Sequence, residues 1–212
     1  MDFRRILSDT VVSGLRTSLV ILRGIIVIPI ITRFIGGETY GLWASTFALV
    51  SLAMTVGGLH IHGALIRYLK PDDRQAFSDT LALILISSTV ASSIFLVFGV
   101  VFEKFVENVL NMPSELLLVG GLLLFSQVMV EFSVNYPRAL SRVKTFELLQ
   151  SVRMAFGTVV LGLVIFYTRD IILAFLGLAI ADLALALLLI AFYLRRSDFP
   201  LPDPSNFTRY LR

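Results

Sequence analysis

The sequence of 212 residues is 57% hydrophobic and only 16% charged, whereas a soluble domain carries roughly 25% charged residues. This composition excludes a soluble globular domain and indicates an all-α, polytopic membrane protein. The net charge of +3 does not indicate a nucleic-acid partner, because the basic residues lie in short loops, and the lack of cysteine excludes disulfides and cysteine-based metal sites.

The first apolar stretch, 10–32, is long enough to cross a bilayer but contains Arg16 and Arg23. At about 1.5 Å per residue, Val11 to Thr32 spans roughly 33 Å, close to the thickness of the hydrocarbon core. An arginine near the centre of a span costs about 2.5–3.5 kcal/mol, while each Leu, Ile or Val contributes only about 0.3–0.6 kcal/mol in favour of insertion. Because seven residues at about 100° each make nearly two helical turns, both arginines share one helix face, which we predict lines a hydrated cavity.

Five further apolar stretches follow, and with the first they predict six transmembrane helices over residues 1–194. They are 40–64, 77–101, 116–136, 147–168 and 171–194. The joins GGET, KPDDRQ, NMPSE and YPRALSRVK are loops by composition, and a tight TRD turn precedes the last stretch. The small residues of SSTVASS within the third stretch predict a close approach by a neighbouring helix. Residues 195–212 are polar and contain three prolines, which is typical of an extended linker.

The basic residues are unevenly distributed between alternate loops. Twelve lie in the N-terminal segment, the second and fourth loops and the tail, whereas only Arg33, Lys104 and Arg169 lie in the first, third and fifth loops. By the positive-inside rule, both termini, and with them the linker, are expected to be cytoplasmic in a plasma-membrane protein.

Further ionisable residues fall inside or near the apolar stretches, and such residues are functional by default in a membrane. They are Glu131, Arg153, Asp182 and His60. Glu131 forms a polar stripe with Gln127 and Asn135, each one helical turn away. We expect Glu131, Asp182 and His60 to act as an ion site or as charge-pair partners.

Depth along the predicted helices suggests which charges meet. Glu131 is expected to pair with Arg153 or Arg16, and Asp182 with Arg23. The functional hypothesis is a cationic cavity in which Arg16, Arg23 and Arg153 bind an anionic headgroup, because the planar guanidinium donates two parallel hydrogen bonds to phosphate. The alternative is that every charge is paired and only fixes the register of the helices.

Motifs typical of enzymes are absent from the sequence, including GxSxG, HExxH and the phosphate-binding loop. We therefore expect no enzymatic activity, no cofactor and no metal site.

Two segments carry a resemblance to a known family. PIITRFIGGETYGLWAS and GGLHIHGALIRYL resemble the first two spans of polysaccharide flippases of the multidrug/oligosaccharidyl-lipid/polysaccharide exporter superfamily. The residues that carry the match are Pro29, Arg33, Gly36, Tyr40, Gly41 and Arg67. NFTRYLR, near the end of the sequence, resembles the segment that leads into the seventh span of that family.

The resemblance implies translocation of a polyprenyl-diphosphate-linked oligosaccharide across the cytoplasmic membrane during polysaccharide biosynthesis. It also implies that the diphosphate contacts arginines of the first span, here Arg16 and Arg23. Family members have two six-span lobes with alternating access between them, so this chain resembles the N-terminal lobe. We favour a fragment or truncated reading frame, with a homodimer or a separately encoded second lobe as alternatives. The expected partners are membrane lipids, the lipid-linked oligosaccharide diphosphate and the second lobe, with no nucleic acid.

Two other functions stay open. A cation-coupled multidrug-type exporter of the same superfamily would depend on Asp182 or Glu131 rather than on the arginines. A six-span membrane assembly subunit without transport activity would have all its intramembrane charges paired and no cavity.

Overall fold

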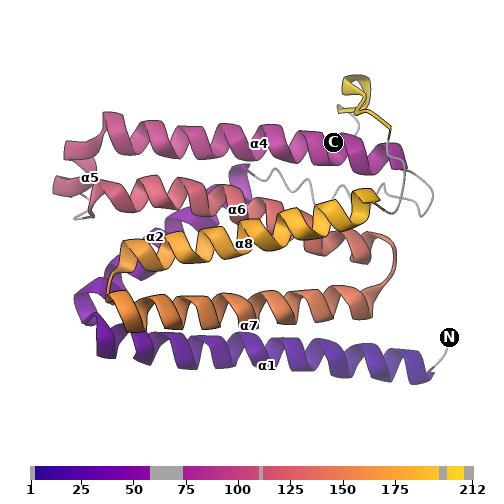
Figure 1. Ribbon diagram of the computed structural model, residues 1–212, viewed down its shortest axis with the longest axis horizontal. Coiled ribbons are helices and arrows are strands. Elements are labelled where there is room, and N and C mark those ends of the chain that lie inside the picture. Colours follow the sequence, from indigo (N-terminus) through magenta and orange to yellow (C-terminus); the bar gives the residue numbers. More distant parts are fainter. Residues whose placement is uncertain (1–2, 58–73, 110–111, 196–199, 208–212) are drawn as a thin grey trace.

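The computed structural model describes residues 3–57, 74–109, 112–195 and 200–207, and these form helices without any strand (Figure 1). The elements are α1 (Phe3–Phe34), α2 (Gly37–Gly57), α4 (Arg74–Val101), α5 (Glu103–Val109), α6 (Ser114–Ala139), α7 (Val143–Thr168), α8 (Ile171–Arg195) and a 3₁₀ turn, η1 (Pro204–Asn206). The all-α prediction is confirmed.

Four helices, α4, α6, α7 and α8, are long and apolar enough to cross a membrane, and they coincide with the last four predicted stretches. The first stretch lies in α1, whose segment Gly24–Phe34 is apolar, and the second begins in α2 and continues outside the described residues. Large apolar side chains remain exposed on the outer faces, including Ile94 on α4, Val159 on α7 and Leu188 on α8. Apolar faces of this extent suit contact with lipid rather than water.

The centre of the bundle is α6. In its most apolar window 72% of the residues are buried, compared with 22% in α4 and in α7. This helix packs against α2, α4, α7 and α8, whereas α1 packs mainly against α7. Across Figure 1 the order is therefore α4, α6, α8, α7 and α1, with α2 behind the central helices.

Alternate loops meet at the same end of the bundle. The turns after α1, α4 and α7 lie at the left in Figure 1, whereas α4 and α7 begin, and α6 and α8 end, at the right. Consecutive long helices from α4 to α8 therefore run in opposite directions, as a chain that crosses a membrane repeatedly requires.

The turn between α7 and α8 is as tight as predicted. Arg169 adopts the left-handed conformation, with φ of 54°, and its N–H bonds the carbonyl oxygen of Ile165. The Asp170 carboxylate then accepts the N–H groups of Ile172 and Leu173 at 2.7 and 3.3 Å, which caps the start of α8. A reversal of direction thus needs only two residues.

The loop predicted over YPRALSRVK is shorter than expected. Helix α6 continues through Pro137 to Ala139, and α7 already begins at Val143. Proline normally disfavours a helix interior because it has no N–H for the carbonyl oxygen four residues earlier. That oxygen belongs to Ser133 and accepts the Tyr193 hydroxyl instead, at 3.1 Å, so the last turn of α6 is retained.

The small residues of SSTVASS bring α4 and α6 together as predicted. The buried Ser92 hydroxyl donates to the carbonyl oxygen of Gly121 at 2.6 Å. A Cβ atom at Gly121 would lie 3.2 Å from the Ser92 carbonyl oxygen, closer than most real contacts. Glycine is therefore what permits this separation of the two helices.

Candidate functional site

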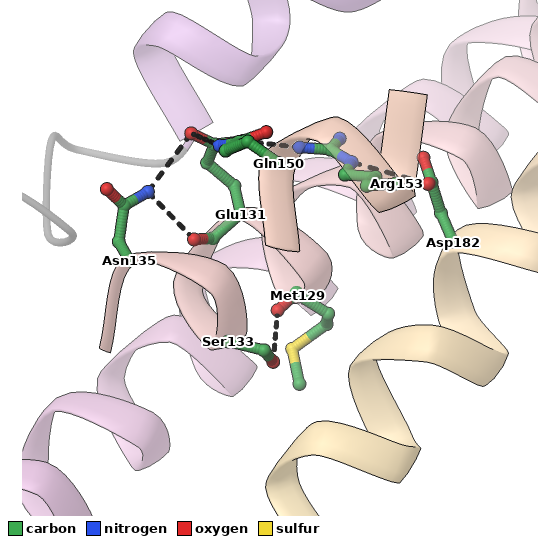
Figure 2. Close-up of polar contacts among 7 residues, drawn as sticks. All are labelled: Met129, Glu131, Ser133, Asn135, Gln150, Arg153 and Asp182. Carbon is green, nitrogen blue, oxygen red and sulfur yellow. Dashed lines mark hydrogen bonds and ion pairs between the residues drawn. The ribbon is translucent and has the colours of Figure 1, made fainter. Parts of the chain in front are cut away.

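One arginine joins three helices within the bundle. Arg153, on α7, donates from Nη1 to Glu131 Oε2 on α6 at 2.5 Å, and from Nε to Asp182 Oδ1 on α8 at 3.4 Å (Figure 2). Asp182 is buried, and the other two side chains are half-buried. Burial of a charge is costly unless an opposite charge and further hydrogen bonds compensate it, and this arginine supplies both carboxylates with such a partner.

Two side-chain amides also contact Glu131. Asn135, one turn later on α6, donates from Nδ2 to Glu131 Oε1 at 3.0 Å and to the Glu131 carbonyl oxygen at 2.8 Å. Gln150, from α7, donates to the same Oε1 at 3.4 Å. In Figure 2 the two amides and the guanidinium surround the carboxylate. The direction in which Glu131 points is thus set by groups on two helices.

A cavity of about 250 Å³ lies beside these residues. Its lining combines the polar side chains of Gln127, Glu131, Gln150, Arg153 and Asp182 with Phe47, Met54, Met154, Gly157 and Leu178. Pockets that enclose a drug-sized ligand usually measure about 300–1,000 Å³, so this one can take only a part of a large substrate. The mixture of polar groups and apolar walls is typical of a binding pocket rather than of a packed core.

The charges around the cavity are unequal. Among its described lining residues, Glu131 and Asp182 are acidic and only Arg153 is basic. When all three are ionised, the described lining carries one excess negative charge. Both acids are hydrogen-bond acceptors, so the cavity can receive the hydroxyl groups of a ligand.

The pairing of Glu131 with Arg153 is confirmed, and so is the stripe that links Glu131 to Asn135. The contact between Asp182 and Arg153 was not expected, because depth along a span does not give the neighbour of a helix. A guanidinium on a long side chain can reach two acids at different depths.

Several predicted site residues are not placed by the structure. The side chains of Arg16 and Arg23, both on α1, and all of His60 lie outside the described residues. The predicted pair of Asp182 with Arg23 thus stays a prediction, as do the substrate-binding roles of the arginines.

Gln150 was not among the site residues predicted from the sequence. Its position was informative, because Gln150 and Arg153 are three residues apart and therefore share one face of α7. A polar residue one turn from an intramembrane arginine is a signal that could have found it.

Comparison with known proteins agrees with the membrane fold. Residues 6–212 match a protein-family model described as "Polysaccharide biosynthesis protein". No curated protein and no solved structure matches the chain.

Proposed function

This chain belongs to the family of polysaccharide biosynthesis proteins, and we propose that it acts there as one lobe of a flippase for lipid-linked oligosaccharides. The observation that carries the proposal is the polar cavity lined by residues of α2, α6, α7 and α8, with Arg153 between two carboxylates. A lipid-linked oligosaccharide needs such a hydrated path, because its sugar hydroxyls cannot enter hydrocarbon without hydrogen-bond partners.

The two polar parts of the substrate call for different protein groups. The diphosphate is anionic, and we assign it to Arg16 and Arg23, which share one face of the first helix. Arginine suits this role because it stays charged and forms paired hydrogen bonds with phosphate oxygens.

The sugar suits the cavity beside Glu131. Carboxylates accept hydrogen bonds from sugar hydroxyls, and the amides of Gln127 and Gln150 can both donate and accept them. Arg153 was predicted to bind the headgroup directly; within this proposal its two ion pairs fit the role of holding Glu131 and Asp182 in position.

The proposal includes an orientation and a partner. We place the protein in the plasma membrane with both termini in the cytoplasm, and the distribution of basic residues supports this orientation. A second six-span lobe, from the same polypeptide or from a second copy, supplies the opposite wall of the substrate path.

The two carboxylates that line the cavity, Glu131 and Asp182, support one rival function, a cation-coupled exporter. In that case Glu131 and Asp182 would bind the coupling ion, and loss of either negative charge would stop transport. In the flippase proposal Glu131→Gln keeps an oxygen acceptor for a hydroxyl and retains part of the activity.

The test is a complementation assay with the complete transporter in a host that needs it for surface polysaccharide. Arg16→Ala and Arg23→Ala should abolish surface polysaccharide at normal membrane levels, and Arg195→Ala, which removes an equal charge at the exposed end of α8, should not. Normal polysaccharide in both α1 variants would count against the diphosphate role. Loss with Glu131→Gln but not with the α1 variants would favour the cation-coupled exporter.

A further inference from the structure

Residues 200–206, which follow α8 in the sequence, have few backbone N–H groups that can donate hydrogen bonds. Residues 200–206 read PLPDPSN, and its three prolines have no backbone N–H. The sequence alone therefore suggested an extended linker. Yet in Figure 1 η1 lies next to the start of α4.

Two side chains of α4 hold this segment. The carboxylate of Asp79 is fully buried and accepts the backbone N–H of Asp203 at 2.6 Å and the side-chain amide of Asn206 at 3.0 Å. Gln75, one turn earlier, donates both to Asp79 at 2.7 Å and to the carbonyl oxygen of Leu201 at 2.9 Å. Hydrogen bonds to an ionised acceptor are stronger than those between neutral groups.

The segment is folded so that its donors converge on Asp79. The Asp203 carboxylate accepts the N–H of Ser205 at 2.9 Å, which starts the 3₁₀ turn and brings Asn206 beside Asp79. This backbone hydrogen bond from Ser205 holds the pKa of Asp203 below its usual range. Phe207 then packs against the buried core.

Aromatic packing joins three helices beside Asp79. Phe77 packs on Tyr136 of α6, with ring centroids 4.5 Å apart, and Tyr136 packs on Tyr193 of α8 at 4.6 Å. Asp79 therefore projects from a point where three helices are already fixed to one another. A contact with Asp79 fixes the bound segment relative to all three.

We propose that Gln75 and Asp79 form a docking site for residues 201–206 of the same chain, here called the strap. Through these contacts the strap, which follows α8 in the sequence, is held against the first turns of α4. The docking site is separate from the polar cavity.

Hydrogen–deuterium exchange on the full chain in detergent tests this inference. Only five backbone N–H groups contribute to a peptide over 200–207, because three of its residues are prolines. Replacement of Asp79 by Ala should speed exchange at Asp203 by about 10- to 100-fold, the factor expected for loss of a hydrogen bond to a charged group. Gln75→Ala and Asn206→Ala each remove a part of the docking site and should give smaller increases.

The matched control is Glu103→Ala, which removes an exposed carboxylate at the start of α5, just beyond the opposite end of α4, and should leave the peptide unchanged. If Asp79→Ala does not fold, as judged by size-exclusion chromatography, the two smaller truncations decide. Wild-type exchange at Asp203 in every folded strap variant would overturn the proposal. No substrate is present, so the outcome is independent of the polysaccharide assay.

Discussion

The hydroxyl of Tyr193 on α8 donates a hydrogen bond to the carbonyl oxygen of Ser133 on α6, at 3.1 Å. In an ordinary helix that oxygen would accept the N–H of residue 137, which here is proline. A side chain from another helix thus replaces the missing backbone donor. The pair explains how α6 keeps a proline in its last turn and why α8 packs closely against that turn.

We expect Tyr193→Phe to destabilise the protein by about 1–3 kcal/mol, the cost of leaving a buried acceptor without a partner. The ring is retained, so packing against Tyr136 and Phe77 is preserved. Thermal unfolding in detergent measures the effect. Tyr167→Phe, which removes a hydroxyl from an exposed ring, should change little.

The double variant makes this prediction specific. Pro137→Ala restores the N–H that Ser133 lacks, so Tyr193→Phe should cost clearly less in that background than in the wild type. Equal costs in the two backgrounds would show that the hydroxyl does not compensate for the proline.

Gly121→Ala should destabilise the contact between α4 and α6 by about 1–3 kcal/mol, as overpacking does in a close-packed interior. The new Cβ would lie 3.2 Å from the backbone oxygen of Ser92, and a backbone atom cannot turn aside as a side chain can. The same change at Gly162 meets its nearest atom only at 3.8 Å, so it should be neutral or stabilising by up to about 1 kcal/mol through helix propensity. Similar melting temperatures for the two variants would contradict this account.

The orientation in the membrane can be tested by cysteine labelling, because the natural sequence has no cysteine. Gly37→Cys, after α1, and Ser141→Cys, between α6 and α7, place single thiols at exposed positions at opposite ends of the bundle. An impermeant maleimide should label the first in intact cells and the second only after the membrane is opened. The reverse pattern would overturn the cytoplasmic assignment of both termini.

The sequence predicts those features that depend on local pattern. Hydropathy locates α4, α6, α7 and α8 within a few residues, and the spacing of Glu131 and Asn135 already indicates their contact. The end of α6 was misplaced because the donor that stabilises Pro137 is Tyr193, which lies on another helix.

Contacts between distant segments were out of reach for the same reason. Asp79 and Asp203 are 124 positions apart, and no periodicity links them. The meeting of Asp182 with Arg153 likewise depends on α7 lying beside α8, which depth along the membrane normal does not specify.

The last prediction concerns Arg153, which forms ion pairs with both Glu131 and Asp182. Arg153→Met keeps much of the side-chain volume but removes the guanidinium from both carboxylates. Breaking a buried pair in this way costs about 3–5 kcal/mol, and the effect here should fall toward the lower end since Arg153 and Glu131 are partly exposed.

Neutralising the acids at the same time should recover most of that loss. In the triple variant Arg153→Met, Glu131→Gln and Asp182→Asn, no buried carboxylate is left to lose its counter-charge, so unfolding should occur closer to the wild-type temperature. Thermal unfolding of the single and triple variants measures the difference. If the triple variant is less stable than Arg153→Met alone, the carboxylates stabilise the bundle without the arginine. Arg153 would then not be the counter-charge on which their burial depends.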